Sequence, residues 1–188
     1  APLSALESED LLHYRVGNVN IRPQFTGGMV YNDNIFFRSD DASRQLLEGP
    51  KEGDLINQIG PGVTFSLGEN FINTLSFSYN YLHRFYADHS QLSSGDHKVG
   101  LSGDVTSGKV RLSTLHNLSY LTGIQGINVQ IVEQSNRLQF SDQLRVSLDL
   151  TPKSDVYFSG SYLKTDQAET SAFADVSNWN TAAGYGFK

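Results

Sequence analysis

Residues 137–151 read RLQFSDQLRVSLDLT, and in this stretch apolar and polar side chains alternate. The even-numbered positions carry leucine, phenylalanine or valine, apart from Asp142, and the odd-numbered positions carry arginine, glutamine, serine, aspartate or threonine. A β-strand sends successive side chains to opposite faces, whereas an α-helix would spread the same leucines and charges around its circumference. The stretch therefore predicts a strand with one apolar and one polar face.

Strand length distinguishes between the two architectures that use such strands. In an antiparallel sandwich the apolar face packs into a protein core, and in a membrane β-barrel it contacts lipid. Globular strands are mostly about five or six residues long, while a tilted strand needs roughly 9 to 11 residues to cross a bilayer. The 137–151 stretch is long enough to cross.

Composition narrows the class further. The 188 residues are 38% hydrophobic, with no run of about 18 apolar residues, which excludes transmembrane helices. Alternating strands conceal their apolar face in an averaged hydropathy, so a negative mean value remains compatible with a barrel. The absence of cysteine excludes disulfides and thiolate metal sites, and a net charge of −6 argues against nucleic-acid binding. The start at Ala1 is typical of a mature chain whose signal peptide has been removed.

The same alternation recurs along the chain and predicts about eight strands. Residues 1–18 are expected to form a periplasmic N-terminal leader. In 109–120 the alternation changes phase near Thr114 and Leu115, which predicts a β-bulge. The expected strands are 19–31, 54–67, 71–86, 97–106, 109–120, 137–151, 156–164 and 177–188.

The connections between these strands are expected to alternate between long and short. Polar loops at 39–53, 87–96, 122–136 and 166–175 contrast with brief turns such as 107–108. Long loops outside and tight turns at the periplasmic rim are typical of bacterial outer-membrane barrels. The predicted fold is therefore an all-β, antiparallel, up-and-down transmembrane β-barrel in 19–188, in the bacterial outer membrane.

Several motifs also resemble those of the β-barrel porin 2 family, whose members are outer-membrane barrels often associated with exopolysaccharide secretion. The similarity covers about 19–106. The motifs are RPQFTGGMVYNDNIFFR at 22–38, DLI at 54–56, GPGV at 60–63, YNY at 79–81 and FYAD at 85–88, of which YNDNI at 31–35 is the sharpest.

The resemblance leaves the completeness of the barrel open. Family members are about twice as long, with roughly 16 to 18 strands, which implies that this chain corresponds to an N-terminal half of a larger barrel. A small closed barrel is the alternative, favoured by an even strand count and by Tyr185-Gly186-Phe187, which resembles the C-terminal aromatic assembly signal of outer-membrane proteins. Eight strands leave an interior filled by side chains, whereas sixteen or more leave a water channel.

The polar positions of the strands carry more cations than anions. A cationic lumen would attract anions, because low-dielectric walls focus the field of the charges that line it. The alternative is that these arginines pair with acids and simply fill a small closed barrel. The candidate lumen-lining residues are Arg22, Arg84, Lys98, Asp104, Arg111, Arg137, Arg145 and Asp149.

Aromatic residues at the strand ends predict interfacial girdles. Asp142 interrupts the apolar parity of its strand, which is explained most simply by a position in the headgroup zone. The expected girdle consists of Tyr79, Tyr81 and Trp179 at the outer interface and Phe71 and Phe187 at the inner one.

Neither a metal site nor a catalytic site is predicted. Asp33, Asp40 and Asp41 could supply oxygen ligands to calcium, but they show no EF-hand spacing and read as a solvated loop. His83 and His116 could be posed as in lipid-editing barrel enzymes, but no serine is singled out as a nucleophile. No cofactor is expected, and the chain is expected not to be an enzyme.

The sequence thus predicts a porin-like barrel that acts as a passive conduit or pore subunit for exopolysaccharide or anionic solutes. A closed barrel that serves as an anchor or adhesin through its long loops is the first alternative, and a lipid-modifying enzyme is a remote one. The expected partners are outer-membrane lipid, lipopolysaccharide and polysaccharide-export or other outer-membrane proteins, and no nucleic acid.

Overall fold

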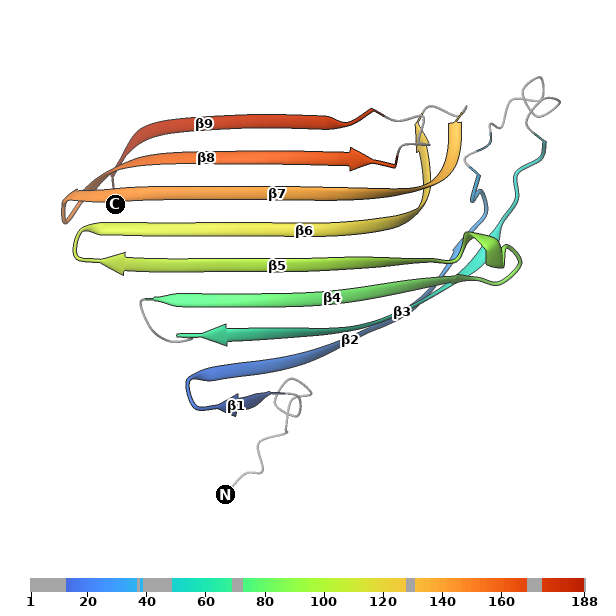
Figure 1. Cartoon of the computed structure of the whole chain (residues 1–188), viewed down its shortest axis with the longest axis horizontal. Helices are drawn as coiled ribbons and strands as arrows, with labels where there is room; N and C mark the ends of the chain where they lie inside the picture. Colours follow the sequence, from blue (N-terminus) through green and yellow to red (C-terminus); the bar gives the residue numbers. More distant parts are fainter. Residues whose placement is uncertain are drawn as a thin grey trace.

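The chain forms one antiparallel sheet of nine strands joined in chain order (Figure 1). The structure, a computed structural model, describes residues 13–36, 38, 49–68, 73–127, 131–168 and 174–187, with only the backbone described for 124–127 and 131–135. The predicted all-β, antiparallel, up-and-down arrangement is confirmed. None of the helices in the described part is long and apolar enough to cross a membrane.

The strands lie close to the expected positions, with one addition. The short strand β1 falls inside the segment expected to be a leader, and the first twelve residues lie outside the described part. A single turn of 3-10 helix, η2 at Ser90–Leu92, precedes β5. The strands are β1 (Tyr14–Val16), β2 (Val19–Asn32), β3 (Asp54–Leu67), β4 (Thr74–Tyr86), β5 (Ser94–Ser107), β6 (Val110–Ile127), β7 (Ile131–Thr151), β8 (Ser154–Gln167) and β9 (Val176–Phe187).

The sheet is open, with β1 at one edge and β9 at the other (Figure 1). The closed eight-stranded alternative is therefore not what these strands form. Because β1 pairs only with residues 19–21, the rest of β2 is an edge. Pro23 lies on this edge, where the backbone N–H that proline lacks is not needed by a second neighbour.

The prediction of a third long loop, at 122–136, is wrong. Residues 122–127 and 131–136 continue the hairpin instead, and β6 and β7 remain paired from Val110 and Leu148 up to Ile127 and Ile131. This stretch carries polar residues at both parities, so the alternation that reveals a half-buried strand disappears although the backbone ladder continues. The β6–β7 hairpin is consequently the longest in the sheet, with strands of 18 and 21 residues.

The prediction of a β-bulge near Thr114 is also wrong. The β5–β6 register runs without interruption from Ser107 opposite Val110 to His97 opposite Tyr120. The apparent change of phase arises because Thr114 and His116 occupy apolar-side positions and Leu115 occupies a polar-side position. In the β7–β8 pair the register shifts between Asp149 and Thr151.

Direct cross-strand partners share a face, so the ladders divide the side chains into two sets. We define the polar face by one row of partners and the apolar face by the adjacent row. The row on the polar face is Asn20, Ser66, Ser76, Ser102, Leu115, Gln143, Ser161 and Asn180. The row on the apolar face is Ile21, Phe65, Phe77, Leu101, His116, Asp142, Tyr162 and Trp179.

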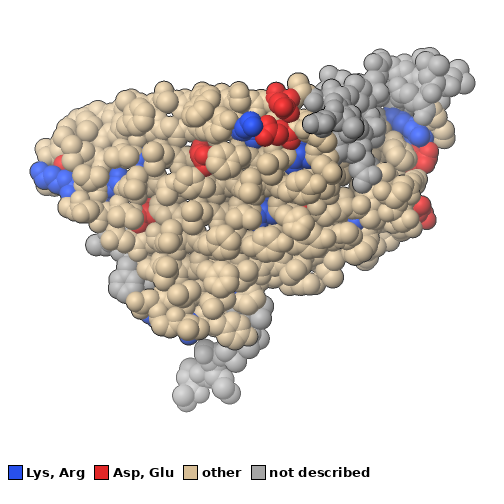
Figure 2. All heavy atoms as spheres, viewed as in Figure 1, with Lys and Arg blue, Asp and Glu red and all other residues tan. Residues whose placement is uncertain are grey.

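This single layer has almost no hydrophobic core of its own. Among the described residues the buried hydrophobic side chains are Ile35 and Ile56, both near the end of the sheet that carries the loop 33–53. Large apolar side chains from β2 to β9 are exposed instead. Figure 2 shows broad areas of the visible face without charged side chains. A sheet that exposes so much apolar surface lacks the second layer that a sandwich would provide.

The turns at the other end of the sheet are staggered along the strand direction. Strand β3 ends at Leu67, in line with Leu75 and Gly103, whereas β5 continues to Ser107. Val110 pairs with Leu148, whereas β7 continues to Thr151. Such a progressive stagger is what strands tilted within a curved wall require.

Candidate functional site

All eight candidate lumen residues lie on the polar face. Arg22 is paired with Thr64, Lys98 lies between Asn80 and Ser119, and Arg111 lies between Thr106 and Ser147. The same ladders place the remaining five on this face: Arg84, Asp104, Arg137, Arg145 and Asp149.

The acids on this face are more numerous than the sequence pattern indicated. Asp54, Asp96 and Asp155 share it, so the expected excess of positive charge over the whole face is smaller. Asp96 is nearly buried and forms an ion pair of 2.8 Å with Arg84. Arg84 therefore neutralises a neighbouring carboxylate.

These additional acids lie toward the two ends of the strands. Asp54 and Asp96 lie near the long connections, and Asp155 lies beside the 152–153 turn. The middle of the face keeps its cations, with Asp104 as the acid among them. Arg111, the second residue of β6, lies near the turn end. The charged residues of this middle zone are Arg22, Lys98, Asp104 and Arg145.

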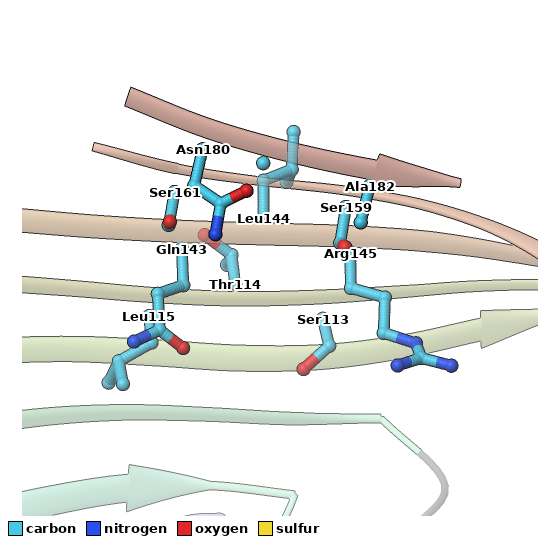
Figure 3. Close-up of a pocket in the computed structure, with 11 residues that line it drawn as sticks. Ser113, Thr114, Leu115, Gln143, Leu144, Arg145, Ser159, Ser161, Asn180 and Ala182 are labelled. Carbon is cyan, nitrogen blue, oxygen red and sulfur yellow. The ribbon is translucent and has the colours of Figure 1, made fainter. Parts of the chain in front are cut away.

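A hollow of about 460 Å³ lies over β6 to β9 in this zone. Figure 3 shows the side chains of Ser113, Gln143 and Arg145 extending to one side of the sheet. The Arg145 guanidinium stacks on the Tyr157 ring at 4.0 Å, an arrangement that holds its charge over the sheet. Leu115 also lines the hollow, as a leucine on an otherwise hydrophilic face.

Of the expected girdle, the four described members lie on the apolar face. Tyr79 and Tyr81 form side-chain hydrogen bonds with His97 and His83, at 2.9 and 2.8 Å. Trp179 is 73% exposed and stacks on Tyr162 with ring centroids 4.1 Å apart, and Phe187 lies near the 152–153 turn. Phe71 lies outside the described residues.

The structure brings three sequence motifs together at the loop end of the sheet: NDNIF at 32–36 with Arg38, DLI at 54–56 and FYAD at 85–88. Asn34 exchanges two hydrogen bonds of 2.8 Å with the Arg38 backbone, and the Ile35 N–H donates to the Glu52 carbonyl at 2.9 Å. The backbone N–H groups of Ala87 and His89 donate to the Asp54 carboxylate, each at 2.9 Å. These distant segments therefore form one hydrogen-bonded unit.

At the centre of this unit is what we call the loop cluster: Arg38, Glu52, Asp54 and His89. His89 Nδ1 lies 2.9 Å from Asp54, and its Nε2 lies 3.0 Å from Glu52. Carboxylates only accept hydrogen bonds, so both imidazole nitrogens act as donors and the ring is favoured as a cation. Arg38 binds Glu52 from the other side and lies 4.9 Å from the Phe36 ring.

The protonation equilibria of the loop cluster follow from these contacts. The hydrogen bonds to Asp54 and Glu52 raise the pKa of His89, and those from Arg38 and His89 lower the pKa of Glu52. Asp54 is buried, which opposes its charge, but the hydrogen bonds from the Asp88 backbone and from His89 hold its pKa at about 2. Every charge in the cluster has a partner, which fits a structural role.

Two groups in the structure could not be read from the sequence alone. The loop cluster joins segments more than thirty residues apart, although its motifs were visible. Asp142, the irregularity of strand β7, bonds to His116 on β6, and no short motif marks that pairing. Within the described residues no group of three potential metal ligands is close enough to hold an ion. Asp40 and Asp41 lie outside this part of the chain.

Fold and faces together define a class: a single-layer, open, up-and-down antiparallel sheet with one polar and one exposed apolar face. Comparison with known proteins does not refine that class. The chain matches no family model, no curated protein and no solved structure.

Proposed function

We propose that this sheet forms part of the wall of a porin-like β-barrel in the bacterial outer membrane, with the apolar face toward lipid and the polar face toward an aqueous conduit. The proposal rests on the difference between the two faces of the sheet. Apolar side chains such as Leu101, Leu118 and Leu144 are exposed on one side, and the charged residues of the middle zone lie on the other. Burying the apolar side in hydrocarbon removes the cost of exposing it to water.

The open edges support a larger assembly. In hydrocarbon every backbone N–H and C=O group must be paired within the protein. The outer edge of β9 and the edge of β2 beyond residue 21 present such groups. Additional strands, from more of the polypeptide or from a second copy, would close the wall. The resemblance to the β-barrel porin 2 family points to the same kind of larger barrel.

The conduit is proposed to favour anions, in particular acidic polysaccharide or small anionic solutes. Arg111 and Arg145 lie on adjacent strands of the polar face, because Arg111 pairs with Ser147 and Arg145 pairs with Ser113. Arg111 lies near the turn end of β6, while Arg22, Lys98 and Arg145 lie farther along their strands with Asp104 as the acid among them, so we expect a positive field over that part of the face.

Planar-bilayer recording tests this proposal. The refolded chain, with a second copy supplying the strands that close the wall, is expected to give stable conductance steps with a preference for chloride over potassium. The double variant Arg111→Glu with Arg145→Glu is expected to lower or reverse that preference. Arg84→Gln serves as the matched control, because Arg84 is already paired with Asp96 and should leave selectivity nearly unchanged. Conducting channels whose selectivity is the same in the double variant would contradict a lumen on this face.

A further inference from the structure

The apolar face carries one connected set of polar side chains, which we call the β6–β7 triad: Thr114, His116 and Asp142. The Thr114 hydroxyl lies 2.6 Å from His116 Nε2, and His116 Nδ1 lies 2.5 Å from the Asp142 carboxylate. Thr114 and His116 are two residues apart on β6 and so share a face, and Asp142 is the direct cross-strand partner of His116.

With the imidazole neutral, these contacts assign a role to each atom. A carboxylate only accepts hydrogen bonds, so Nδ1 carries the proton that it donates to Asp142. In the neutral imidazole Nε2 is then the unprotonated nitrogen, and it accepts the hydrogen bond that the Thr114 hydroxyl donates. A hydroxyl, an imidazole base and a carboxylate in this order form the arrangement that activates an oxygen nucleophile in unrelated hydrolases.

A merely structural explanation accounts for only part of the triad. His116 alone would compensate Asp142 on an apolar surface, where an isolated carboxylate is costly. That explanation uses only Nδ1 of His116. It gives no role to Nε2, which lies beside the Thr114 hydroxyl. Valine at position 114 would suit the apolar face better than threonine does, because its shape is the same and it adds no polar atom.

The surroundings of the triad leave room for a lipid acyl chain. Gly103 lies opposite Thr114 on β5, so the β5 side of Thr114 carries no side chain, whereas Leu144 lies opposite Thr114 on β7 and Gly160 lies beyond Leu144 on β8. A Cβ added at Gly160 would meet only a backbone oxygen 3.9 Å away. On the apolar face Thr114 therefore has a glycine on its β5 side and a leucine on its β7 side, and an acyl chain would lie along the β5 side.

On β8, charged residues begin on the apolar face close to the triad. Tyr162 lies opposite Asp142, and the next two residues on the same face are Lys164 and Asp166, which form an ion pair of 2.7 Å. The stacked Tyr162 and Trp179 rings are an aromatic pair of the kind found at the lipid headgroup level. A lipid whose headgroup contacts this charged pair would bring its ester groups to the triad.

We propose that the β6–β7 triad hydrolyses acyl esters of membrane lipids. This activity rests on the proposed orientation, with the apolar face toward lipid, and does not depend on a conducting lumen. Thr114 is the nucleophile, His116 is the general base and acid, and Asp142 is a positioning residue that holds the imidazole tautomer.

The reaction consumes only the lipid ester and water. Thr114 Oγ1 attacks the ester carbonyl carbon while its proton passes to His116 Nε2. The bond from that carbon to the lipid alcohol oxygen breaks, and the alcohol leaves with the proton from Nε2. Water then attacks the acyl-threonine, giving its proton to Nε2, and the free fatty acid leaves as the proton returns to Thr114.

Fatty-acid release from lipid is the first readout. The protein, refolded into vesicles of phosphatidylethanolamine and phosphatidylglycerol that carry a fluorescent acyl chain, is expected to release labelled fatty acid above the rate of protein-free vesicles. A parallel assay with vesicles containing lipid A distinguishes the two sources of acyl ester. Mass spectrometry after treatment with a long-chain alkyl fluorophosphonate is expected to find the phosphonyl group on Thr114, with fluoride displaced.

Variants separate this site from a structural role. Thr114→Val and His116→Gln are expected to lower the rate by about 10³-fold or more, whereas Thr114→Ser keeps activity. Asp142→Asn should lower the rate and change its pH profile, because it alters the imidazole tautomer. Thr181→Val, on the same face of β9 opposite Gly160, is the matched control. Heat-modifiable migration establishes that each variant is folded.

Two results would overturn the proposal. One is a folded protein that releases no more fatty acid than protein-free vesicles from either lipid. The other is hydrolysis that Thr114→Val leaves unchanged. Conductance recorded from the same preparation remains informative about the pore in both cases, so failure of the triad and failure of the conduit are distinguishable.

Discussion

Leu112 and Leu115 form a matched pair for testing which face of the sheet contacts lipid. Both lie on β6, and both are 37% exposed, but Leu112 is on the apolar face and Leu115 on the polar face. Arginine on the lipid side of a barrel costs about 2–4 kcal/mol at the bilayer midplane and about 0–1 kcal/mol near the interfaces. Leu112 lies one apolar-face position inside Val110, near the turn end of β6, so we expect Leu112→Arg to cost about 1 kcal/mol. Leu115→Arg, facing water, should cost less than about 0.5 kcal/mol.

The free energy of unfolding of each variant can be measured by denaturant titration of the protein folded in lipid vesicles. Trp179 provides the signal, because it is the single tryptophan of the chain and lies on the apolar face. Leu112→Ala and Leu115→Ala report the loss of leucine contacts without a charge. If both arginine variants lose the same stability, or if Leu115→Arg loses more, the assignment of the faces is refuted.

Further predictions concern the sheet backbone and the loop cluster. Gly60→Ala should destabilise the fold by about 1–3 kcal/mol in the same titration, because its Cβ would overlap the Tyr81 carbonyl oxygen, whereas Gly28→Ala meets nothing within 4 Å and should be nearly neutral. Asp54 lies at the loop end of β3, beyond the stretch needed to cross a bilayer. Its lowered pKa, about 2, stabilises the cluster above its ordinary pKa of 3.8, and this contribution is lost as pH falls toward 2. The raised pKa of His89 makes its contribution complete below pH 6.5 and lost as pH rises through the folded value. Proteolysis of the loop 33–53 should therefore be slowest near pH 5 to 6 in wild type, with Asp54→Asn removing most of this dependence; a flat wild-type profile would contradict the assigned contacts.

The alternation of residues predicted much of this fold because a half-exposed strand has a strict period of two. Strand β7 could be assigned from Leu138 to Leu150 on that ground, and the faces of the eight candidate lumen residues followed from parity. The same signal fails wherever both faces of a strand are polar, which is why residues 122–136 were expected to form a loop.

Contacts between strands were harder to predict from the sequence. The pairing of Asp142 with His116 depends on the β6–β7 register, which a single strand does not specify. The β5–β6 register is unbroken, so the change of phase in the sequence does not mark a bulge. It arises because Thr114 lies on the apolar face and Leu115 lies on the polar face. The loop cluster depends on the path of the connection between β2 and β3, so its motifs could be seen but their meeting point could not.

Cysteine scanning of β7 tests whether one face of the sheet contacts lipid and the other contacts water. The chain has no cysteine, so single-cysteine variants from residue 138 to 148 need no background substitution. In protein folded into vesicles, a membrane-impermeant, water-soluble thiol reagent should label the odd-numbered positions and spare the even-numbered ones, apart from Asp142. A hydrophobic thiol probe dissolved in the bilayer should show the opposite pattern. Equal labelling of both parities by the water-soluble reagent would contradict the account.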